Sequence, residues 1–250
     1  MAAPIDLYYW TTPNGWKVSI ALEEMGLPYT VKLVDIDNGE QNNPEFLALA
    51  PNAKIPMIVD PEGPDGAPIA VFESGAILQY LARKTGQFYG PTERDRVSVD
   101  MWVMWQMSGL GPIAGQTHHF LRALGRRNPP VVHDYPNERF TKEVARLYKV
   151  LDEQLGRTRY VAGDFYSIAD MCIWPWASQW MRQGQTMHDK HNMRRWLVEV
   201  GHRPAVRKGR LIEAHRPWRG STPRNAALAN CVPRSEWTIS PGAGRRCVMA

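Results

Sequence analysis

The stretch NAKIPMIVDPEGPDGAPIAVFESG, residues 52–75, decides the fold of this chain. An Ile-Pro pair leads into the apolar run 57–59, and a turn rich in glycine and proline separates it from a second apolar run, Ile69–Phe72. Short apolar runs divided by turn residues are typical of two paired strands. After Glu73, apolar residues recur at spacings of three and four, which predicts a helix that begins at Ser74.

The residues before this stretch predict the rest of an α/β domain. The pattern indicates a strand at Ile5–Tyr9, a helix from the turn at 11–15 to about Met25, a strand at 29–36 and a short helix at Pro44–Leu49. Together with the two strands and the helix described above, this gives the order β-α-β-α-β-β-α. That order is typical of a thioredoxin-like domain, which we assign to residues 1–86.

Beyond a linker predicted at residues 87–92, the pattern is purely helical. Apolar residues recur every three or four positions in 94–107 and 139–155, and Ser167-Ile168-Ala169-Asp170 resembles a capping box before an apolar helix. We therefore predict an all-α domain over residues 93–212. The expected fold class is a thioredoxin-like α/β domain followed by an all-α domain.

The positive charge of the chain lies near its end. The 250 residues carry a formal net charge of +5, and residues 216–250 hold six arginines against one glutamate, so the remainder is neutral. This distribution argues against nucleic acid as a partner, because the predicted folded body has no basic excess to attract a polyanion. Residues 213–250 are predicted to form a basic, irregular Pro/Arg-rich tail. The alternative is an arm over the active site or a site for an anionic partner.

Other features favour a cytoplasmic location without a membrane or metal partner. No apolar run approaches the roughly 20 residues that span a bilayer, and the first residues lack the basic and apolar segments of a signal peptide. Cys172, Cys231 and Cys247 form no CxxC pair and no ligand cluster, as in proteins of reducing compartments. His118 and His119 are adjacent on a predicted helix, so they do not converge on one metal ion.

Motifs in both halves of the chain carry a resemblance to a known family. The first half holds Thr12-Pro13-Asn14-Gly15, NAKIP (52–56) and FESG (72–75), and the second half holds WQMSGLGP (105–112) and GQTHHF (115–120). With these motifs the chain resembles glutathione transferases, and among them the bacterial Nu class and its fungal nitrogen-regulator relatives, over roughly residues 5–210. The resemblance implies a homodimer that uses glutathione as co-substrate. Nu-class members hold two glutathiones, or one glutathione disulfide, in one cleft and reduce disulfides without a protein cysteine.

By this resemblance, residues of the first half bind the glutathione backbone. Glu73 would pair with the γ-glutamyl ammonium, and Ser74, at a helix N-terminus, would bind the γ-glutamyl carboxylate. Ile55, followed by a proline expected to be cis, would pair with the cysteinyl unit, and Gln41 and Lys54 would contact the glycyl end. The alternatives are that Ser74 is an ordinary N-cap and that Lys54 is a solvated surface residue.

Thr12 and Asn14 are the candidate catalytic residues. A thiol with an ordinary pKa of about 8.5 is little ionised at neutral pH, and hydrogen-bond donors aimed at the thiolate lower that pKa. Thr12 offers a hydroxyl and Asn14 an amide at the predicted start of the first helix. The alternative is that Asn14 only N-caps this helix. Tyr8 and Tyr9, in the preceding strand, are second choices for the contact with the sulfur.

Arg139 is the candidate contact to a second glutathione, by the same resemblance. The alternative is an exposed helix residue that pairs with Glu143, four positions on. By the resemblance, the expected function is glutathione-dependent reduction of disulfides without a protein cysteine, and the turn at 11–14 indeed has no cysteine to form a mixed disulfide with the protein. Two other functions stay open: transfer of glutathione to an aromatic electrophile or thiolytic cleavage of an ether, and a non-catalytic glutathione-binding regulatory module. The expected partners are therefore glutathione or its disulfide and a small disulfide or electrophile.

Overall fold

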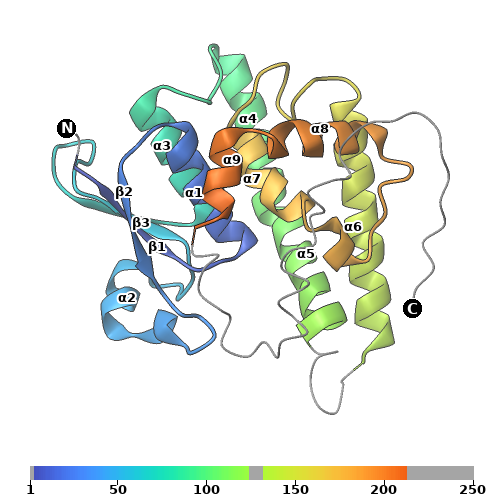
Figure 1. Ribbon diagram of the computed structural model, residues 1–250, viewed down its shortest axis with the longest axis horizontal. Coiled ribbons are helices and arrows are strands. Elements are labelled where there is room, and N and C mark those ends of the chain that lie inside the picture. Colours follow the sequence, from blue (N-terminus) through green and yellow to red (C-terminus); the bar gives the residue numbers. More distant parts are fainter. Residues whose placement is uncertain (1–2, 124–131, 213–250) are drawn as a thin grey trace. The chain divides into compact units, whose positions relative to one another are not determined.

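A four-stranded mixed sheet organises the first part of the chain (Figure 1). Its strands are β1 (Ile5–Tyr9), β2 (Tyr29–Leu33), β3 (Met57–Asp60) and β4 (Ile69–Phe72), in the order β2-β1-β3-β4. β1 runs parallel to β2, and β3 runs antiparallel to both β1 and β4. The structure is a computed structural model that describes residues 3–123 and 132–212, so the predicted tail at 213–250 lies outside the described residues.

Helices cover both faces of this sheet. α1 (Pro13–Glu24) and α3 (Ser74–Thr85) pack against the face that carries Leu7, whereas α2 (Pro44–Leu49) packs against the opposite face through Phe46. The alternation of side chains along β1 accounts for this, because successive residues of a strand point to opposite faces. The predicted thioredoxin-like order of elements is confirmed.

The second strand is shorter than the sequence predicts. β2 ends at Leu33 instead of residue 36. Beyond it, Asp35 Oδ1 accepts hydrogen bonds from the backbone N–H groups of Asp37 (3.1 Å) and Asn38 (3.2 Å). A side chain that bonds the backbone two and three residues on makes a tight turn, and this turn takes the chain out of the sheet.

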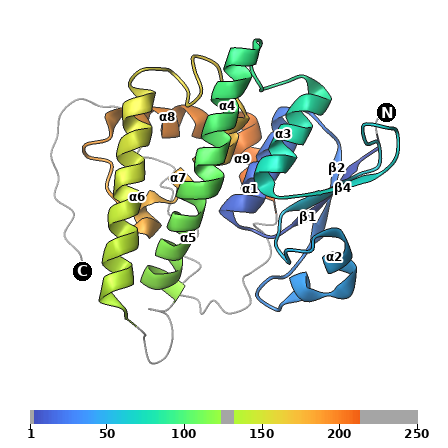
Figure 2. The same ribbon diagram turned by 180° about the vertical axis from the view of Figure 1, so that it is seen from behind.

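The second part of the described chain is helical, as predicted (Figure 2). Its α-helices are α4 (Glu93–Trp105), α5 (Gly111–His118), α6 (Asp134–Leu155), α7 (Ile168–Ala177), α8 (His191–Gly201) and α9 (Pro204–Arg210). A π-helical turn, η2 (Gln106–Leu110), connects α4 to α5, and a second one, η3 (His119–Ala123), follows α5. No helix in the described ranges is long and apolar enough to cross a membrane. The domain limits at residues 86, 92 and 212 stay predictions.

Helix α7 lies in the core of the helical part, and all ten of its residues are buried. The predicted capping box is confirmed: Ala169 N–H donates to Ser167 Oγ, and Asp170 Oδ2 accepts from Ser167 N–H at 3.0 Å. Asp170 Oδ1 accepts further bonds from Trp196 Nε1 (2.8 Å) and from the backbone N–H of Val161 (3.1 Å). Complete burial of this carboxyl outweighs these bonds and raises its pKa to about 6.

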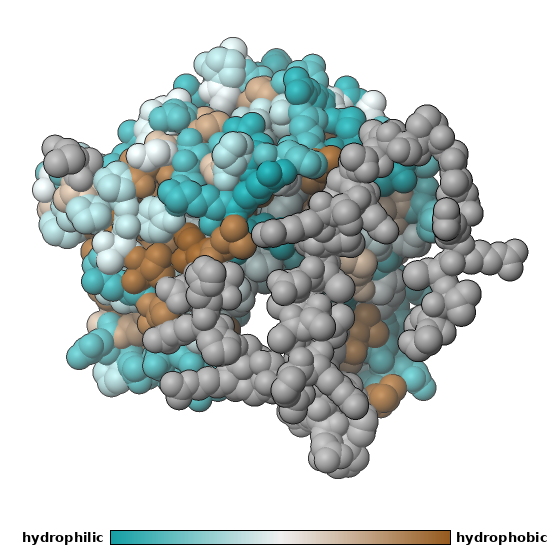
Figure 3. Space-filling model, viewed as in Figure 1, coloured by the Kyte–Doolittle hydropathy of each residue, from teal (hydrophilic) through white to brown (hydrophobic). Residues whose placement is uncertain are grey.

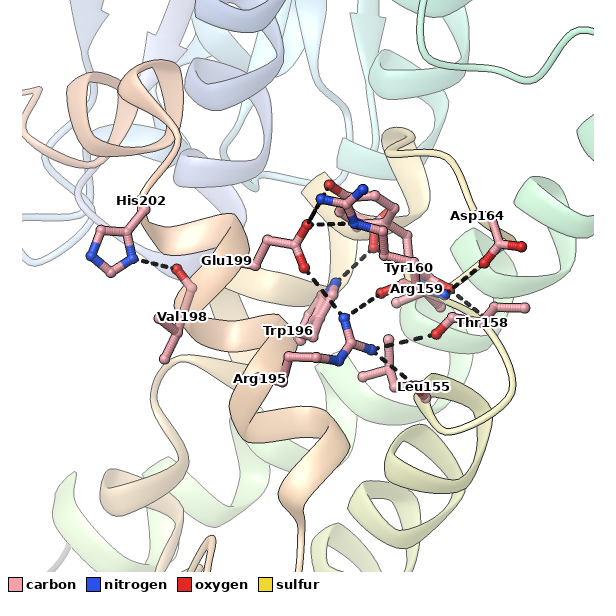
Figure 4. Close-up of polar contacts among 12 residues, drawn as sticks. Leu155, Thr158, Arg159, Tyr160, Asp164, Arg195, Trp196, Val198, Glu199 and His202 are labelled. Atoms are coloured by element: carbon pink, nitrogen blue, oxygen red, sulfur yellow. Dashed lines mark hydrogen bonds and ion pairs between the residues drawn. The ribbon is translucent and has the colours of Figure 1, made fainter. Parts of the chain in front are cut away.

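An ion-pair cluster joins the end of α6 to α8 (Figure 4). Glu199 accepts hydrogen bonds from Arg159 Nε and Tyr160 Oη, both at 2.8 Å, and pairs with Arg195 at 3.3 Å. Arg195 also donates to the backbone carbonyl of Leu155, the last residue of α6, at 3.0 Å. The loop that leads from α6 to α7 is thereby bound to α8.

Candidate active site

The strand register brings the predicted site segments to one edge of the sheet. Met57, the first residue of β3, pairs with Tyr8 near the end of β1 and with Phe72 at the end of β4. The turn after β1, Ile55 before β3 and Glu73 after β4 therefore leave the sheet at the same edge. Residues far apart in the sequence converge there because β3 lies between β1 and β4.

Thr12 is the N-cap of α1. Its backbone is extended (φ −136°, ψ 161°), and its Oγ1 accepts a 3.1 Å hydrogen bond from the backbone N–H of Gly15. A hydroxyl that accepts one hydrogen bond still has its own hydrogen to donate. The alternative that Asn14 caps this helix is wrong, because Thr12 holds the N-cap position. Gly15 permits this close turn, since a Cβ there would lie 2.4 Å from the carbonyl oxygen of Trp10.

Asn14 is held from the helical part of the chain. Its Oδ1 accepts a 2.8 Å hydrogen bond from Nε1 of Trp176, on α7. Because the amide oxygen faces the indole, the Nδ2 group faces away from it with two hydrogens to donate. Thr12 and Asn14, both half-buried, thus carry donors at the start of α1, where the helix dipole also favours negative charge.

Glu73 and Ser74 form the start of α3. Glu73 has a left-handed backbone (φ 68°), uncommon for a residue with a Cβ, and its side chain is exposed. Its Oε1 accepts a 3.4 Å hydrogen bond from Nδ2 of Asn52. The alternative that Ser74 is the N-cap is wrong: Glu73 occupies that position, and Ser74 is the first helical residue and buried. An exposed carboxylate beside the N–H groups of a helix start offers one group for each charge of a zwitterion.

Ile55 precedes Pro56 through a cis peptide bond, as expected. The backbone N–H and C=O of Ile55 make no hydrogen bond with another described residue, so they can pair with an extended peptide ligand. Lys54 beside it is exposed, and Gln41 lies in the 3₁₀ turn η1 (Glu40–Asn42), with a buried Oε1 that has no partner among the described residues. Ligand contacts of Gln41 and Lys54 stay predictions.

Arg139 lies in a groove between α5 and α6 of about 590 Å³. Of the alternative, the exposure of Arg139 is confirmed, but Glu143 forms its ion pair with Arg146, through two hydrogen bonds of 2.7 and 2.8 Å, and has only a longer-range attraction to Arg139. Arg139 itself is exposed and forms no ion pair with another described residue. The groove therefore presents a guanidinium that can bind a ligand carboxylate. The residues that line it are Ile113, Tyr135, Glu138, Arg139, Phe140, Lys142, Glu143 and Arg146.

Sequence reasoning missed a buried lysine behind Ser74. Lys17 of α1 is 1% exposed, and its Nζ lies 3.2 Å from Ser74 Oγ and 2.6 Å from Oε1 of Gln106. The thiol of Cys172 donates to the same Gln106 oxygen at 3.2 Å. Burial lowers the pKa of Lys17 and raises the pKa of Cys172. The available signal was position: Lys17 lies four residues before the apolar Ala21, and thus on the same side of the predicted helix.

The other candidates are placed in packing roles. Tyr9 is completely buried, and Tyr8 packs against Phe46 of α2 with ring centroids 6.0 Å apart. His118 stacks obliquely on Trp176 with ring centroids 5.5 Å apart, so it lies near Asn14. Within residues 3–123 and 132–212, no three His, Cys, Asp or Glu residues gather as metal ligands would.

Comparison with known proteins agrees with this arrangement. Residues 11–84 match the N-terminal domain model of glutathione S-transferases, and residues 131–204 match the C-terminal domain model of the same family. The chain belongs to the glutathione S-transferase family. This family membership confirms the fold class that the sequence predicts, and the matched ranges contain the candidate site residues except the second choices Tyr8 and Tyr9.

Among its relatives are two disulfide-bond oxidoreductases of Escherichia coli (strain K12). The chain is 44% identical to YfcG over 203 residues, which cover 81% of this chain and 92% of the relative. It is 39% identical to YghU over 226 residues, which cover 84% of this chain and 75% of the relative.

Solved structures of bacterial glutathione transferases are also similar. One, from Burkholderia graminis, has two glutathione molecules bound per subunit; it is 41% identical, covers 85% of this chain and 90% of its own, and superposes with a TM-score of 0.79. Another, from Pseudomonas putida, has one glutathione disulfide bound per subunit; it is 40% identical, covers 84% and 92%, and has a TM-score of 0.77.

Proposed function

We propose that this protein is a glutathione-dependent disulfide-bond oxidoreductase that uses no cysteine of its own. The observation that carries the proposal is the start of α1, where Thr12 and Asn14 offer donor hydrogens and the turn itself, residues 11–14, contains no cysteine. Cys172, the described cysteine, is completely buried with its thiol bonded to Gln106. The names of the two Escherichia coli relatives and the ligands of the bacterial structures support the same activity.

The protein would stabilise sulfur charge while the ligands exchange electrons. A glutathione thiolate attacks one sulfur of the substrate disulfide; a mixed disulfide forms and one substrate thiolate leaves. A second glutathione thiolate then attacks the glutathione sulfur of this mixed disulfide, which releases the second substrate thiol and forms glutathione disulfide. Two glutathiones supply both electrons, so the protein itself is not oxidised. The hydroxyl of Thr12 and the amide of Asn14 would donate to the sulfur that carries charge.

The remaining site residues would hold the two glutathiones. The first would place its γ-glutamyl end at Glu73 and Ser74 and pair its cysteinyl backbone with Ile55. Gln41 and Lys54 would contact its glycyl end. Arg139, in the groove between α5 and α6, would bind a carboxylate of the second glutathione. Fixing both molecules on one subunit raises their effective concentration for thiol–disulfide exchange.

Turnover of two model substrates with glutathione tests the reaction. A hydroxyethyl disulfide should be reduced much faster than a chloronitrobenzene is conjugated. Conjugation without disulfide reduction would contradict the proposal and favour glutathione transfer. Tight glutathione binding with neither activity would instead identify a non-catalytic binding module.

We also infer a homodimer in the cytoplasm, where glutathione is kept reduced. Val97, Met101 and Met104 lie on one side of α4 at spacings of four and three, and they are 50%, 61% and 48% exposed. Such an apolar stripe is typical of a surface that pairs with another copy.

For comparison, the face of the molecule seen in Figure 3 is mostly hydrophilic among the described residues, with a hydrophobic band on its left half. Light scattering should give a dimer mass for the wild type and a monomer mass for Met101→Glu.

A further inference from the structure

The buried ammonium of Lys17 has no carboxylate beside it. Its Nζ contacts three neutral acceptors: Ser74 Oγ at 3.2 Å, Gln106 Oε1 at 2.6 Å and Met107 Sδ at 3.3 Å. No acidic group of the described residues lies within ion-pair distance of it. Burial lowers the pKa of Lys17, and the neighbouring Cys172 thiol and, to a smaller extent, the exposed carboxylate of Glu73 favour the charged lysine without outweighing that burial. When protonated, Lys17 thus has no carboxylate among the described residues as its counter-ion.

A buried ammonium without a carboxylate partner lowers the stability of the folded protein. Burying an ion without an opposite charge loses hydration that neutral acceptors replace only in part. An apolar side chain of similar length would fill the same space, and replacements of buried charges by apolar groups are often neutral or stabilising. Gln106 and Met107, at the start of the π-helical turn η2, surround the charge with polar atoms. π-Helical turns frequently occur at functional sites. A binding role would explain why a lysine is present.

The contact with Ser74 points the charge toward the proposed ligand. Ser74 Oγ accepts from Lys17 Nζ, so its own hydrogen must be donated elsewhere. In this structure that hydrogen faces Met107 Sδ, 3.4 Å away, and a thioether sulfur is a weak acceptor. Gly75 lets α3 lie tightly on this sulfur, since a Cβ there would come within 2.9 Å of Met107 Cγ. A carboxylate at the start of α3 would be a much stronger acceptor for the Ser74 hydroxyl.

We propose that Lys17 is a positioning residue for glutathione, whose buried charge acts through the Ser74 hydroxyl on the α-carboxylate of the γ-glutamyl unit. This inference rests on the proposed function, because it takes glutathione as the ligand at Glu73 and Ser74. In the complex, the ligand carboxylate replaces Met107 as the acceptor of the Ser74 hydrogen and supplies the counter-charge that Lys17 lacks. The lysine itself stays buried and does not touch the ligand.

The test uses Lys17→Met, with Lys32→Met as the matched control. Lys32 is an exposed lysine of β2 that pairs with Asp6, so the control removes the same charge from the same part of the chain. Binding of S-methylglutathione is measured by calorimetry, because this ligand has no thiol to ionise. Lys17→Met should raise its Kd about tenfold or more, while the melting temperature without ligand stays equal or rises. Lys32→Met should leave the Kd unchanged. A merely structural lysine would give a lower melting temperature instead.

A ligand without the γ-glutamyl carboxylate identifies the group that Lys17 acts on. The peptide γ-aminobutyryl-cysteinylglycine, S-methylated, lacks only this carboxylate. The wild type should bind it more weakly than S-methylglutathione, and Lys17→Met should bind it as the wild type does. If Lys17→Met loses affinity equally for both ligands, or loses affinity for neither, the inference is overturned. Failure of the wild type to bind S-methylglutathione would overturn the proposed function as well.

A second variant covers the case in which Lys17→Met does not fold. Ser74→Ala removes the hydroxyl between the lysine and the ligand. It should discriminate between the two ligands clearly less than the wild type does, because the hydroxyl hydrogen bond to the carboxylate is gone while the backbone N–H groups at the start of α3 remain. If Ser74→Ala discriminates between them as strongly as the wild type, the Ser74 hydroxyl does not carry the effect and the inference fails.

Discussion

Trp176 donates a 2.8 Å hydrogen bond from its indole nitrogen to the side-chain oxygen of Asn14, 162 positions earlier in the sequence. The bond determines which end of the Asn14 amide faces the indole. With the oxygen engaged, the two hydrogens of Nδ2 face away from the indole of Trp176 and can be donated to the proposed ligand. A core residue of the helical domain therefore orients a catalytic candidate of the thioredoxin-like domain.

Replacing Trp176 by Phe should raise the pKa of the bound glutathione thiol. Without the indole donor the Asn14 amide can rotate, and its hydrogens no longer point consistently at the sulfur. Loss of one donor to the thiolate should raise that pKa by about half to one unit. The ultraviolet absorbance of the thiolate, followed against pH in the enzyme–glutathione complex, measures this change.

Trp174→Phe is the control for Trp176→Phe. Trp174 also donates an indole hydrogen bond, to the carbonyl oxygen of Leu197 at 3.0 Å, but it has no link to Asn14. Its replacement should leave the thiol pKa unchanged. In an Asn14→Ala background, Trp176→Phe should have no further effect on this pKa. A full effect in that background would show that Trp176 does not act through Asn14.

Thr12→Ala should lose both activity and stability, whereas Thr12→Ser should keep most of each. Alanine removes the donor to the sulfur, which should lower the rate of disulfide reduction about tenfold or more. It also removes the N-cap acceptor of Gly15, which should lower the free energy of unfolding by about 1 kcal/mol. Serine retains the hydroxyl for both. Steady-state rates and denaturant unfolding measure the two effects, and a Thr12→Ala variant with full reductase activity would refute the catalytic role.

Local sequence signals were sufficient for most of the fold. Alternation along β1, the turns between strands, and the capping box at Ser167 and Asp170 all act within a few residues, and the structure has them where the sequence predicts. The cis form of Pro56 was also expected, but only from the family resemblance.

The errors arose where two neighbouring residues could take the same role. Both Thr12 and Asn14 are residue types that favour the N-cap, and Thr12 holds that position because the helix begins at Pro13. Glu143 has two arginines within reach, and Arg146 binds it through two hydrogen bonds. Neither outcome can be obtained from spacing alone. The buried Lys17 was missed because lysines are almost always exposed, so its place on the apolar face was given no weight.

Arg139→Met should weaken the binding of the second glutathione more than the binding of the first. Removing the guanidinium takes away the charge in the α5–α6 groove and leaves the start of α1 and of α3 unchanged. Calorimetry with glutathione should therefore show one site of wild-type affinity and a second site weakened about tenfold or more. Arg146→Met, in the same groove but bound to Glu143, is the control and should change the second site little. Equal weakening in both variants would indicate a general charge effect.

The buried Asp170 should make the protein less stable as the pH rises from about 4 to 6. Its pKa is raised from 3.8 to about 6 by burial, so in this window the native carboxyl holds a proton that the unfolded chain has released. The native state then binds more protons, and the free energy of unfolding falls as pH rises, by about 3 kcal/mol at most. Asp170→Asn stays neutral throughout, so the difference in stability between wild type and variant isolates this effect.

Glu199 provides a control of opposite sign for this pH dependence. Although partial burial acts against it, the hydrogen bonds from Tyr160 and Arg159 hold the pKa of Glu199 below its ordinary value (Figure 4). The stabilisation of the native state by the Glu199 carboxylate is therefore fully present above the pKa that Glu199 has in the unfolded chain, and it is lost as the pH falls. Melting temperatures should be measured from pH 4 to 7. As the pH rises, the melting temperature of the wild type should fall relative to that of Asp170→Asn and rise relative to that of Glu199→Gln. If the difference from Asp170→Asn is constant over this range, Asp170 is ionised in the native state throughout, and its burial does not raise its pKa.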